Sequence, residues 1–449
     1  MLPSIRSVLE KFKIRGGPQL GTEEELKQLC HEMGLSWRER LLTPVVTLRL
    51  FFLQILHGNV AFTALPHIAG FSFASSAYCE ARQRLPLELL QRLLTHVTQK
   101  ALQLQPLAAA DHWLGHRVFI TDATGFTLPD TPALQKHFGQ VPNQRPGCGF
   151  PVAFGLLLMH FGSGLLQRLV VAPLKTNELK MLPEAHDELQ RDDVVVGDSA
   201  FGKYVELALL ALRGVKGVFS LTRRTVDFTP GRLYQAGRQC GRPSSRWLRQ
   251  VGPLDQIVEW FKPRTPSTYL TPEQWAALPE KLTVRELRYR IDRPGFRVHE
   301  VTLVTTLLDH HRYSAQALAD LFHRRWTIET NLRHLKITLG MDTLHAQTVA
   351  GVHKEILMFC LLYNLVRLVM GVAAKAQHVP IDRISFIDAL RWLLYEPTAS
   401  SIPPLITQPH RPDRLEPRVV KRRSKHYPLL TRPRPEMRNA LSPNSLLPK

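Results

Sequence analysis

Two short apolar runs, each leading into an aspartate, constrain the fold of this chain more than any other feature. The run Arg117–Thr121 reads R-V-F-I-T and leads to Asp122, and Val194–Val196 leads through one glycine to Asp198. Short runs rich in β-branched and aromatic residues are typical of strands. Ligands collect at strand ends on open α/β sheets, so the two carboxylates are candidates for one shared site. Taken singly, each aspartate is more often a turn former or a helix cap.

The pattern around these runs predicts a mixed α/β sheet. Apolar runs at 152–160 and 165–172 are joined by a Gly-Ser-Gly turn, which predicts a hairpin. Helical stretches are expected at 177–190 and 204–212, with a further strand at 217–221. This order of elements, from about residue 111 to 222, predicts a sheet with helices on its faces.

Residues 1–110 are predicted to form an N-terminal helical domain that binds DNA. Thr43 and Pro44 supply an N-cap and a first-turn proline for a helix over 45–57. A second helical stretch, 75–103, is expected to break at Pro86. It carries basic side chains that form either a DNA-facing surface or an ordinary solvated face: Arg82, Arg84, Arg92 and Lys100.

Three more segments follow the predicted sheet. Residues 223–300 are polar and arginine-rich with alternating runs, which predicts a β-rich insertion. Residues 301–395 return to helical patterns and are predicted to be the second part of the sheet's domain. The stretch 401–449 holds ten prolines and 11 Lys or Arg against 3 Asp or Glu. Residues 396–449 are therefore predicted to be a basic, disordered C-terminal tail.

The charge balance indicates a polyanionic partner. Lys plus Arg number 58 against 38 Asp plus Glu, a formal net charge of +20. Basic side chains gain free energy by displacing the counterions condensed on nucleic acid, so DNA or RNA is the first candidate. A protein that is simply basic is the alternative.

Two features bear on the compartment. The five cysteines are scattered and include no C-x-x-C pair, so a zinc ribbon is not predicted. Scattered single cysteines indicate a protein of the reducing cytosol. The most apolar stretch, 356–374, is interrupted by Asn364 and Arg367. It is therefore predicted to be a buried core helix rather than a membrane span.

A helix predicted over 314–339 carries a third carboxylate. Side chains spaced 3, 4 and 7 residues apart share one of its faces, beside an apolar stripe: Phe322, Arg325, Glu329 and Lys336. A glutamate flanked by an arginine and a lysine is a candidate metal ligand with phosphate-binding neighbours. The alternative is an Arg–Glu pair on an amphipathic helix, which stabilises the helix by about 0.2–0.5 kcal/mol.

These side chains resemble the signature of a transposase family. The stretch F-H-R-R-W-T-I-E-T-N-L-R-H-L-K is similar to the Tyr-x2-Arg-x3-Glu-x6-Lys signature of one branch of the insertion-sequence DDE transposases. Arg325, Glu329 and Lys336 fall on its arginine, glutamate and lysine. Phe322 stands where the signature has tyrosine, so this chain departs from the family by one hydroxyl.

The resemblance covers about residues 40–395. The family's two aspartates match Asp122 in I-T-D-A-T-G and Asp198 in V-G-D-S-A-F-G, and a β-rich insertion precedes Glu329, as in that branch. The resemblance implies an RNase H-like fold, a mixed sheet flanked by helices. It also implies that the three carboxylates are catalytic and hold Mg²⁺ or Mn²⁺, with two ions per active site.

The activity implied by the resemblance is metal-dependent cut-and-paste transposition. Hydrolysis at the element's ends would be followed by attack of the freed 3′-hydroxyl on target DNA. The partners would be double-stranded DNA, as terminal inverted repeats and as target, and a second copy of the chain in a homodimer. The implied location is the bacterial cytoplasm, associated with the nucleoid, with no membrane partner.

The resemblance and the sequence together suggest DNA-contacting side chains. Arg325 and Lys336 are expected to hold a phosphate near the carboxylates, with Phe322 bearing on the same positioning. Trp326 either stacks a displaced base in a hairpin intermediate or lies in the core. The pair at 223 and 224, just after the strand ending near residue 221, either contacts the DNA end or lies on an ordinary surface: Arg223 and Arg224.

Two other functions compete with transposition. A catalytically weak copy would act as a DNA-binding repressor, and a related metal nuclease would cut without rejoining. The presence of all three carboxylates argues against the repressor. No G-x-x-x-x-G-K-[ST] run is present, so ATP use is not indicated.

Overall fold

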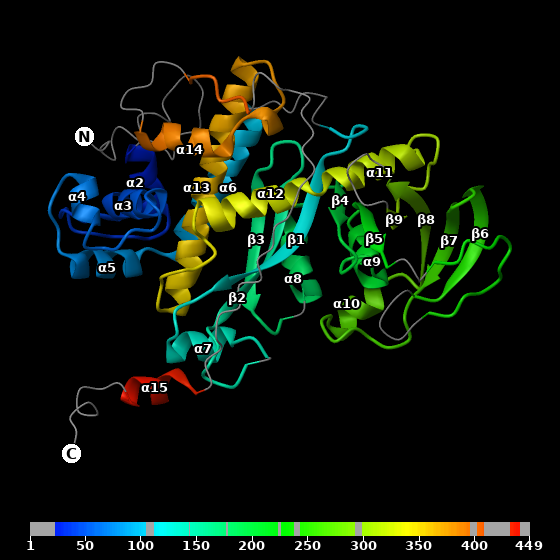
Figure 1. Ribbon diagram of the computed structural model, residues 1–449, viewed down its shortest axis with the longest axis horizontal. Helices are drawn as coiled ribbons and strands as arrows, with labels where there is room; N and C mark the ends of the chain where they lie inside the picture. The colour runs from blue at the N-terminus through cyan, green and yellow to red at the C-terminus, as the bar shows by residue number, and fades with distance from the viewer. Residues whose placement is uncertain are drawn as a thin grey trace.

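The structure is a computed structural model of the chain, and it describes these residues: 23–104, 112–142, 144–176, 178–222, 226–237, 243–291, 299–395, 402–407 and 432–440. Within them the chain forms one nine-stranded sheet with helices on its faces (Figure 1). The mixed α/β sheet predicted from the sequence is therefore confirmed.

The strands are β1 (Val118–Thr127), β2 (Val152–His160), β3 (Leu166–Pro173), β4 (Val194–Gly197), β5 (Lys216–Leu221), β6 (Ser245–Gly252), β7 (Asp255–Phe261), β8 (Lys281–Ile291) and β9 (His299–Thr305). The helices before the sheet are α2 (Glu23–Glu32), α3 (Pro44–Leu56), α4 (Leu65–Ala69), α5 (Ser75–Arg84) and α6 (Leu87–Leu104). Those within and after it are α7 (Pro132–Phe138), α8 (Glu178–Ala185), α9 (Tyr204–Leu212), α10 (Pro272–Ala277), α11 (Ala315–Arg324), α12 (Thr327–Arg333), α13 (Val349–Ala376), α14 (Phe386–Tyr395) and α15 (Arg434–Ala440).

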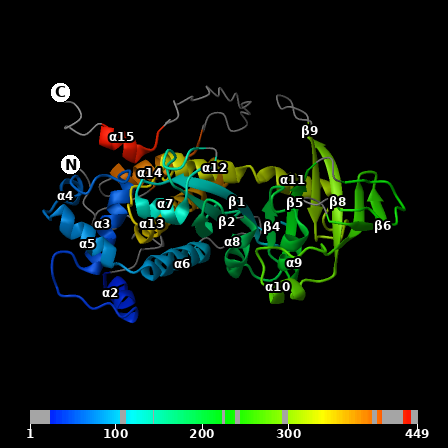
Figure 2. The same ribbon diagram turned by 90° about the horizontal axis from the view of Figure 1, so that it is seen from below.

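The strand order is β3-β2-β1-β4-β5-β9-β8-β7-β6. β1, β2 and β3 are antiparallel neighbours, while β4 pairs parallel with both β1 and β5. β9 pairs antiparallel with β5, and β8, β7 and β6 follow in turn. The predicted β-rich insertion is therefore a continuation of the same sheet. Figures 1 and 2 show α3 and α5 at one end of the molecule and β6 at the other.

Alternating side chains of the central strands build a core on each face of the sheet, as the pleat requires. Phe119 packs in a cluster with α8 and α9. Ile120, one residue on, packs in the large cluster formed by α3, α6 and α13. Val118 lies in a third cluster with α11. Both faces of β1 are therefore covered, which suits its nearly continuous apolar start.

The N-terminal helices follow their sequence signals. Thr43 Oγ1 accepts a hydrogen bond from the N–H of Val46 at the start of α3, and the chain breaks between α5 and α6 at Pro86, as predicted. Arg82 is 9% exposed, so for this residue the alternative of an ordinary solvated face is wrong. Arg84 and Arg92 instead form exposed i,i+4 ion pairs with glutamates, and the Lys100 side chain lies outside the described residues.

α13 is the core helix expected from the sequence. It is long and apolar enough to cross a membrane, but 89% of its most apolar window is buried inside the molecule. Its two polar interruptions bind the β2–β3 hairpin. The Asn364 side chain bonds to both the N–H and the C=O of Leu166, and the Arg367 guanidinium donates to the carbonyl of Ser163.

Three expectations need correction. β1 runs on to Thr127, so Asp122 lies inside the strand and not at its end. The helix predicted over 314–339 is interrupted by a turn at Arg325–Trp326 and ends in a π-helical segment, His334–Thr338. The stretch predicted to be a structureless tail contains a helix, α15, at whose start Arg434 N donates to the carbonyl of Gly147.

Candidate active site

The two aspartates lie at the same level of the sheet. β1 and β4 run parallel, and the last pair of their ladder joins Ile120 to Val196. Asp122 and Asp198 each lie two residues beyond that pair. β4 ends at Gly197, while β1 continues with β2 on its other side, where Asp122 faces Leu157. The pairing of β1 with β4 therefore ends just before both aspartates, while β1 stays paired with β2.

Backbone groups hold both aspartates in place. Asp122 Oδ1 accepts from the N–H of Ala123, and Asp198 Oδ1 accepts from the N–H of Ala200, each at 2.8 Å. Both residues are half-buried. Among the described residues, no cationic side chain forms an ion pair with either carboxylate.

Close packing after β4 explains the glycine before Asp198. A Cβ at Gly197 would lie 2.9 Å from Thr121 Cγ2 and 3.0 Å from Phe201 Cδ2. Real Cβ atoms do not approach neighbours so closely, and these neighbours are core side chains. Glycine at this position therefore lets the end of β4 lie against β1, one residue before Asp198.

The carboxylates influence one another electrostatically. Burial raises the pKa of Asp122, and the negative charges of Asp198 and Glu329 raise it further. The N–H of Ala123 and the Arg325 guanidinium act in the opposite direction. These contributions connect Asp122 electrostatically with Asp198, Glu329 and Arg325, while their assembly into one site stays a prediction.

A fourth carboxylate, not singled out from the sequence, borders this region. Glu178 begins α8, which follows β3, and is half-buried. Burial raises its pKa, followed by the charges of Asp198 and Asp122. The signal available in the sequence was its place in the first turn of a predicted helix, which does not show where that turn meets the sheet.

Arg325 lies in the turn between α11 and α12. Its Nε is buried and makes no hydrogen bond within the described part of the chain. The guanidinium carbon lies 5.4 Å from the centre of the Phe322 ring, which is 7% exposed and packed in the cluster with Val118 and Val196. The Phe322 ring therefore packs against the Arg325 guanidinium. A role of either side chain toward DNA stays a prediction.

Lys336 reaches back to β1. Its Nζ donates to the carbonyl of Gly125 at 2.9 Å and to Thr124 Oγ1 at 3.2 Å, and lies 2.9 Å from Asp342 Oδ1. It sits in the π-helical segment, a form that is frequent at functional sites. Lys336 therefore contacts β1 at the second and third residues after Asp122.

α12 carries the remaining predicted residues. Glu329 is exposed on its first turn, and Trp326, just before it, is 50% exposed. The alternative that Trp326 lies in the core is therefore wrong. Arg223 and Arg224 lie outside the described residues.

The donor set suits a hard divalent cation, which prefers carboxylate oxygens. Crowded carboxylates with a raised pKa at Asp122 are the arrangement whose repulsion a cation relieves. Among the described residues, however, no three His, Cys, Asp or Glu side chains already stand close enough to hold one ion.

The comparison that identifies the family covers this region. A family model described as "Transposase DDE domain" matches residues 113–365, more than half of the chain. The chain belongs to this transposase family. The match spans β1, β4 and α12, and so includes all three predicted carboxylates.

The chain is also similar to individual proteins. The transposase is 25% identical over 376 residues to the transposase InsG of insertion sequence element IS4 from Escherichia coli K12, covering 79% of this chain and 78% of that protein. It is 28% identical over 140 residues to the putative transposase InsZ of the same organism, covering 31% of this chain and 46% of that protein. A piggyBac transposase in a synaptic complex with hairpin DNA aligns over 88% of this chain and 80% of that one, at 9% identity and a TM-score of 0.43.

Proposed function

We propose that this transposase carries out metal-dependent cut-and-paste transposition with Asp122, Asp198 and Glu329 as its catalytic carboxylates. The observation that supports the assignment best is the register of β1 and β4, in which both aspartates lie two residues past the last parallel pair. Glu329 and Arg325 both act electrostatically on Asp122, which connects α12 to the same region.

The fold is proposed to be RNase H-like between β1 and β5. Three antiparallel strands followed by two parallel ones, in the order β3-β2-β1-β4-β5, support this assignment. Residues 111–222 and 301–395 would form this catalytic domain, 223–300 its insertion, 1–110 a DNA-binding helical domain and 396–449 a basic tail.

The three carboxylates would hold Mg²⁺ or Mn²⁺, two ions per site. Bound metal would polarise the scissile phosphate and lower the pKa of the attacking water or hydroxyl. The chain's own side chains would bind and orient the DNA phosphate. Arg325 would hold a phosphate oxygen through its guanidinium, whose buried Nε makes no hydrogen bond within the described residues, and Lys336 adds a positive charge beside β1.

The proposed partners of this transposase are DNA and a second copy of the chain. Exposed Trp326 presents a flat aromatic surface on which a displaced base can stack. The substrates would be terminal inverted repeats and target DNA, held by a homodimer in the bacterial cytoplasm. The formal net charge of +20 supports a polyanionic substrate.

Cleavage and joining separate this proposal from its alternatives. Purified protein is incubated with Mg²⁺ and a plasmid carrying the DNA that flanks the coding sequence. Cleavage at the element's ends with strand transfer, both lost in Glu329→Gln, is the expected result. Cleavage without transfer would indicate a nuclease, and binding without cleavage a repressor. Wild-type activity in Glu329→Gln would refute the proposed site.

A further inference from the structure

A cavity away from the three carboxylates is lined by cations and by no acid. It has a volume of about 540 Å³ and lies between α3, α5 and the start of α13. Its lining residues are Gln54, Phe62, Cys79, Arg82, Gln83, His345, Ala346, Gln347, Thr348, Ala350, Gly351 and Lys354. They include one arginine, one lysine and one histidine, but no aspartate or glutamate.

Both cations are almost completely buried. Arg82 is 9% and Lys354 7% exposed. Neither forms an ion pair within the described ranges. Arg82 stacks on Phe51, with 4.0 Å from its guanidinium carbon to the ring centre, and donates one hydrogen bond to Gln54 Oε1. Lys354 donates to the carbonyls of Gln83 and Arg82 at the end of α5.

These contacts hold the cations without neutralising them. A guanidinium has five N–H donors, of which Gln54 takes one, so several remain for a ligand. Burying two like charges together is unfavourable, and burial together with Arg82 lowers the pKa of Lys354. Natural proteins pair buried charges, so an anion is the missing partner.

Glu355 supplies one buried negative charge behind the cavity wall, against two buried cations, so one positive charge remains in excess. Glu355, fully buried, accepts hydrogen bonds from Asn59 Nδ2 and from the N–H groups of His345 and Ala346. It therefore fixes the loop 345–346 as a wall of the cavity. The first turn of α13, a 28-residue helix, forms the adjoining wall and adds the positive end of its dipole.

The cavity is connected to the catalytic strand. Thr127, at the end of β1, forms a parallel bridge with Thr343, and Leu344 N donates to the carbonyl of Thr127. From Asp122 to Thr127 the strand covers about 17 Å, and from Thr343 to His345 the loop covers at most about 7 Å. Both distances together are shorter than one turn of B-DNA, about 34 Å.

We propose that this cavity binds a backbone phosphate of the DNA duplex, within one helical turn of the cleavage point, through Arg82 and Lys354. The inference rests on the proposed DNA substrate. A phosphodiester supplies the anion that the two cations lack, and contact with the backbone fixes the duplex without reading its sequence. A free phosphate or nucleotide would offer the same chemistry, and the experiment separates these sources.

Ala350→Glu is the main test, because it places a negative charge in the cavity without removing a buried contact. Ala350 is exposed in the first turn of α13, where a glutamate favours the helix. Ala276→Glu, at an exposed alanine of α10, is the matched control. Lys354→Met is a second variant, which keeps the side-chain stem and removes the ammonium.

Binding of a 5′-labelled duplex of about one and a half turns is measured by fluorescence anisotropy without divalent metal, over a range of salt. We expect Ala350→Glu and Lys354→Met to bind about tenfold more weakly, with a salt slope smaller by about one, and Ala276→Glu to match the wild type. Replacing single phosphates of the element's end by methylphosphonate should weaken wild-type binding at one position within a turn of the cut, and leave Ala350→Glu unaffected there.

Each contrary result would overturn a different part of the proposal. Equal affinity and equal salt slope in wild type and Ala350→Glu would overturn the cavity's role while leaving the proposed transposition intact. Failure of the wild type to bind the duplex would overturn both. Stabilisation of the wild type against heat by inorganic phosphate or ATP, lost in Ala350→Glu but without any effect on duplex binding, would replace DNA by a free phosphate ligand.

Discussion

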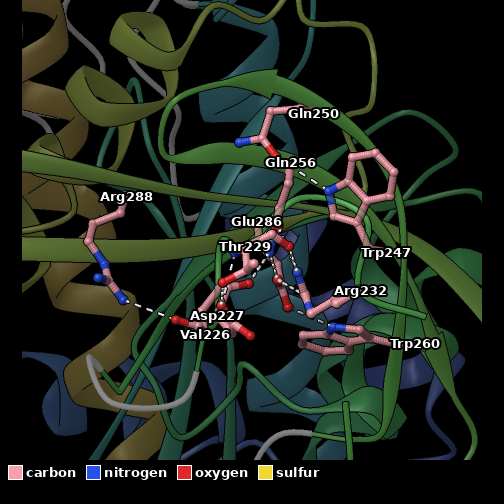
Figure 3. A network of polar contacts seen from close by, with 10 residues as sticks. All are labelled: Val226, Asp227, Thr229, Arg232, Trp247, Gln250, Gln256, Trp260, Glu286 and Arg288. Atoms are coloured by element: carbon pink, nitrogen blue, oxygen red, sulfur yellow. Dashed lines mark hydrogen bonds and ion pairs between the residues drawn. The ribbon is translucent and has the colours of Figure 1, made fainter. Parts of the chain in front are cut away.

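At the β1–β4 part of the sheet, Asp122 and Asp198 accept hydrogen bonds only from backbone N–H groups among the described residues. At the β6–β9 part, the acids are held by side-chain donors. Fully buried Glu286 accepts from Gln256 Nε2 at 2.7 Å and from Trp260 Nε1 at 2.9 Å, and Arg232 Nη2 lies 3.9 Å from its carboxylate (Figure 3).

A second pair in the insertion shows the same arrangement. Buried Arg285 donates through two nitrogens to the carboxylate of Asp255 and through a third to the carbonyl of Tyr313. Side-chain donors stabilise the charged form of these acids and give them a structural role. Within the described residues Asp122 and Asp198 accept no side-chain hydrogen bond, which leaves carboxylate oxygens of both available for a cation. Replacing an acid of the catalytic region should therefore reduce activity but not stability, whereas replacing a buried acid of the insertion should reduce stability.

Asp122→Asn should have the largest effect on activity. The amide removes a metal-binding charge, so cleavage of element-end DNA should fall by about 10³-fold or more. Stability should not fall, because the substitution also removes a crowded, half-buried charge. Gel-based cleavage assays and urea unfolding measure the two effects. A loss of stability of more than about 1 kcal/mol would contradict the comparison.

Glu286→Ala should have the largest effect on stability. It leaves the Arg232 guanidinium, the Gln256 amide and the Trp260 indole N–H without their acceptor, at a cost of about 3–5 kcal/mol. Urea unfolding of the variant measures the loss.

The control for Glu286→Ala is Glu280→Ala, at an exposed glutamate whose side chain pairs with Lys262. That substitution should change stability by less than about 1 kcal/mol. Equal losses in the two variants would show that the buried network does not stabilise the insertion.

Lys336→Met should reduce activity to a smaller extent. The variant keeps the side-chain stem but loses the contacts with Gly125 and Thr124 and the charge beside β1. We expect cleavage to fall about 10–100-fold, since a misplaced phosphate contact costs orientation rather than chemistry. Asp342→Asn, which removes only the lysine's exposed ion-pair partner, should stay within about threefold of the wild type. Equal losses would assign Lys336 a role in fixing its own loop.

Phe322→Tyr should have the smallest effect. The ring is 7% exposed and lies beneath Arg325, so the added hydroxyl has little access to a phosphate. Strand joining should change by less than about tenfold, as measured by strand-transfer product on a supercoiled target. An increase of several orders of magnitude would show that this copy of the transposase is impaired by its phenylalanine.

The sequence predicted the parts of the fold that local chemistry determines. α3 follows from the Thr43 cap, the α5–α6 break from Pro86, and β2 from its apolar run, because each signal acts within a few residues. The turn at Arg325–Trp326 and the π-helix after it were missed, since the apolar period continues through both. Whether three carboxylates meet depends on strand pairing, and the prediction of one shared site came from the family signature as much as from spacing.

Glu178 and the Arg82–Lys354 cavity were missed for a related reason. Glu178 approaches the aspartates only because α8 packs over β2 and β3, and Arg82 and Lys354 are 272 positions apart in the chain. A basic residue on an amphipathic helix is expected to face solvent, and Arg82 does not. Contacts of this kind arise from tertiary packing, to which a single sequence gives no direct access.

The pairing of β5 with β9 restricts how this transposase can be shortened. Phe219 and Val304 are neighbours in that ladder, and both are buried. Deleting the insertion together with β9 would turn β5 into a bare sheet edge, with unpaired N–H and C=O groups beside apolar side chains. Such an edge recruits other chains and aggregates unless lysine, proline or a covering loop protects it. A smaller enzyme made for genome engineering would therefore need a redesigned border at β5 before its activity could be judged.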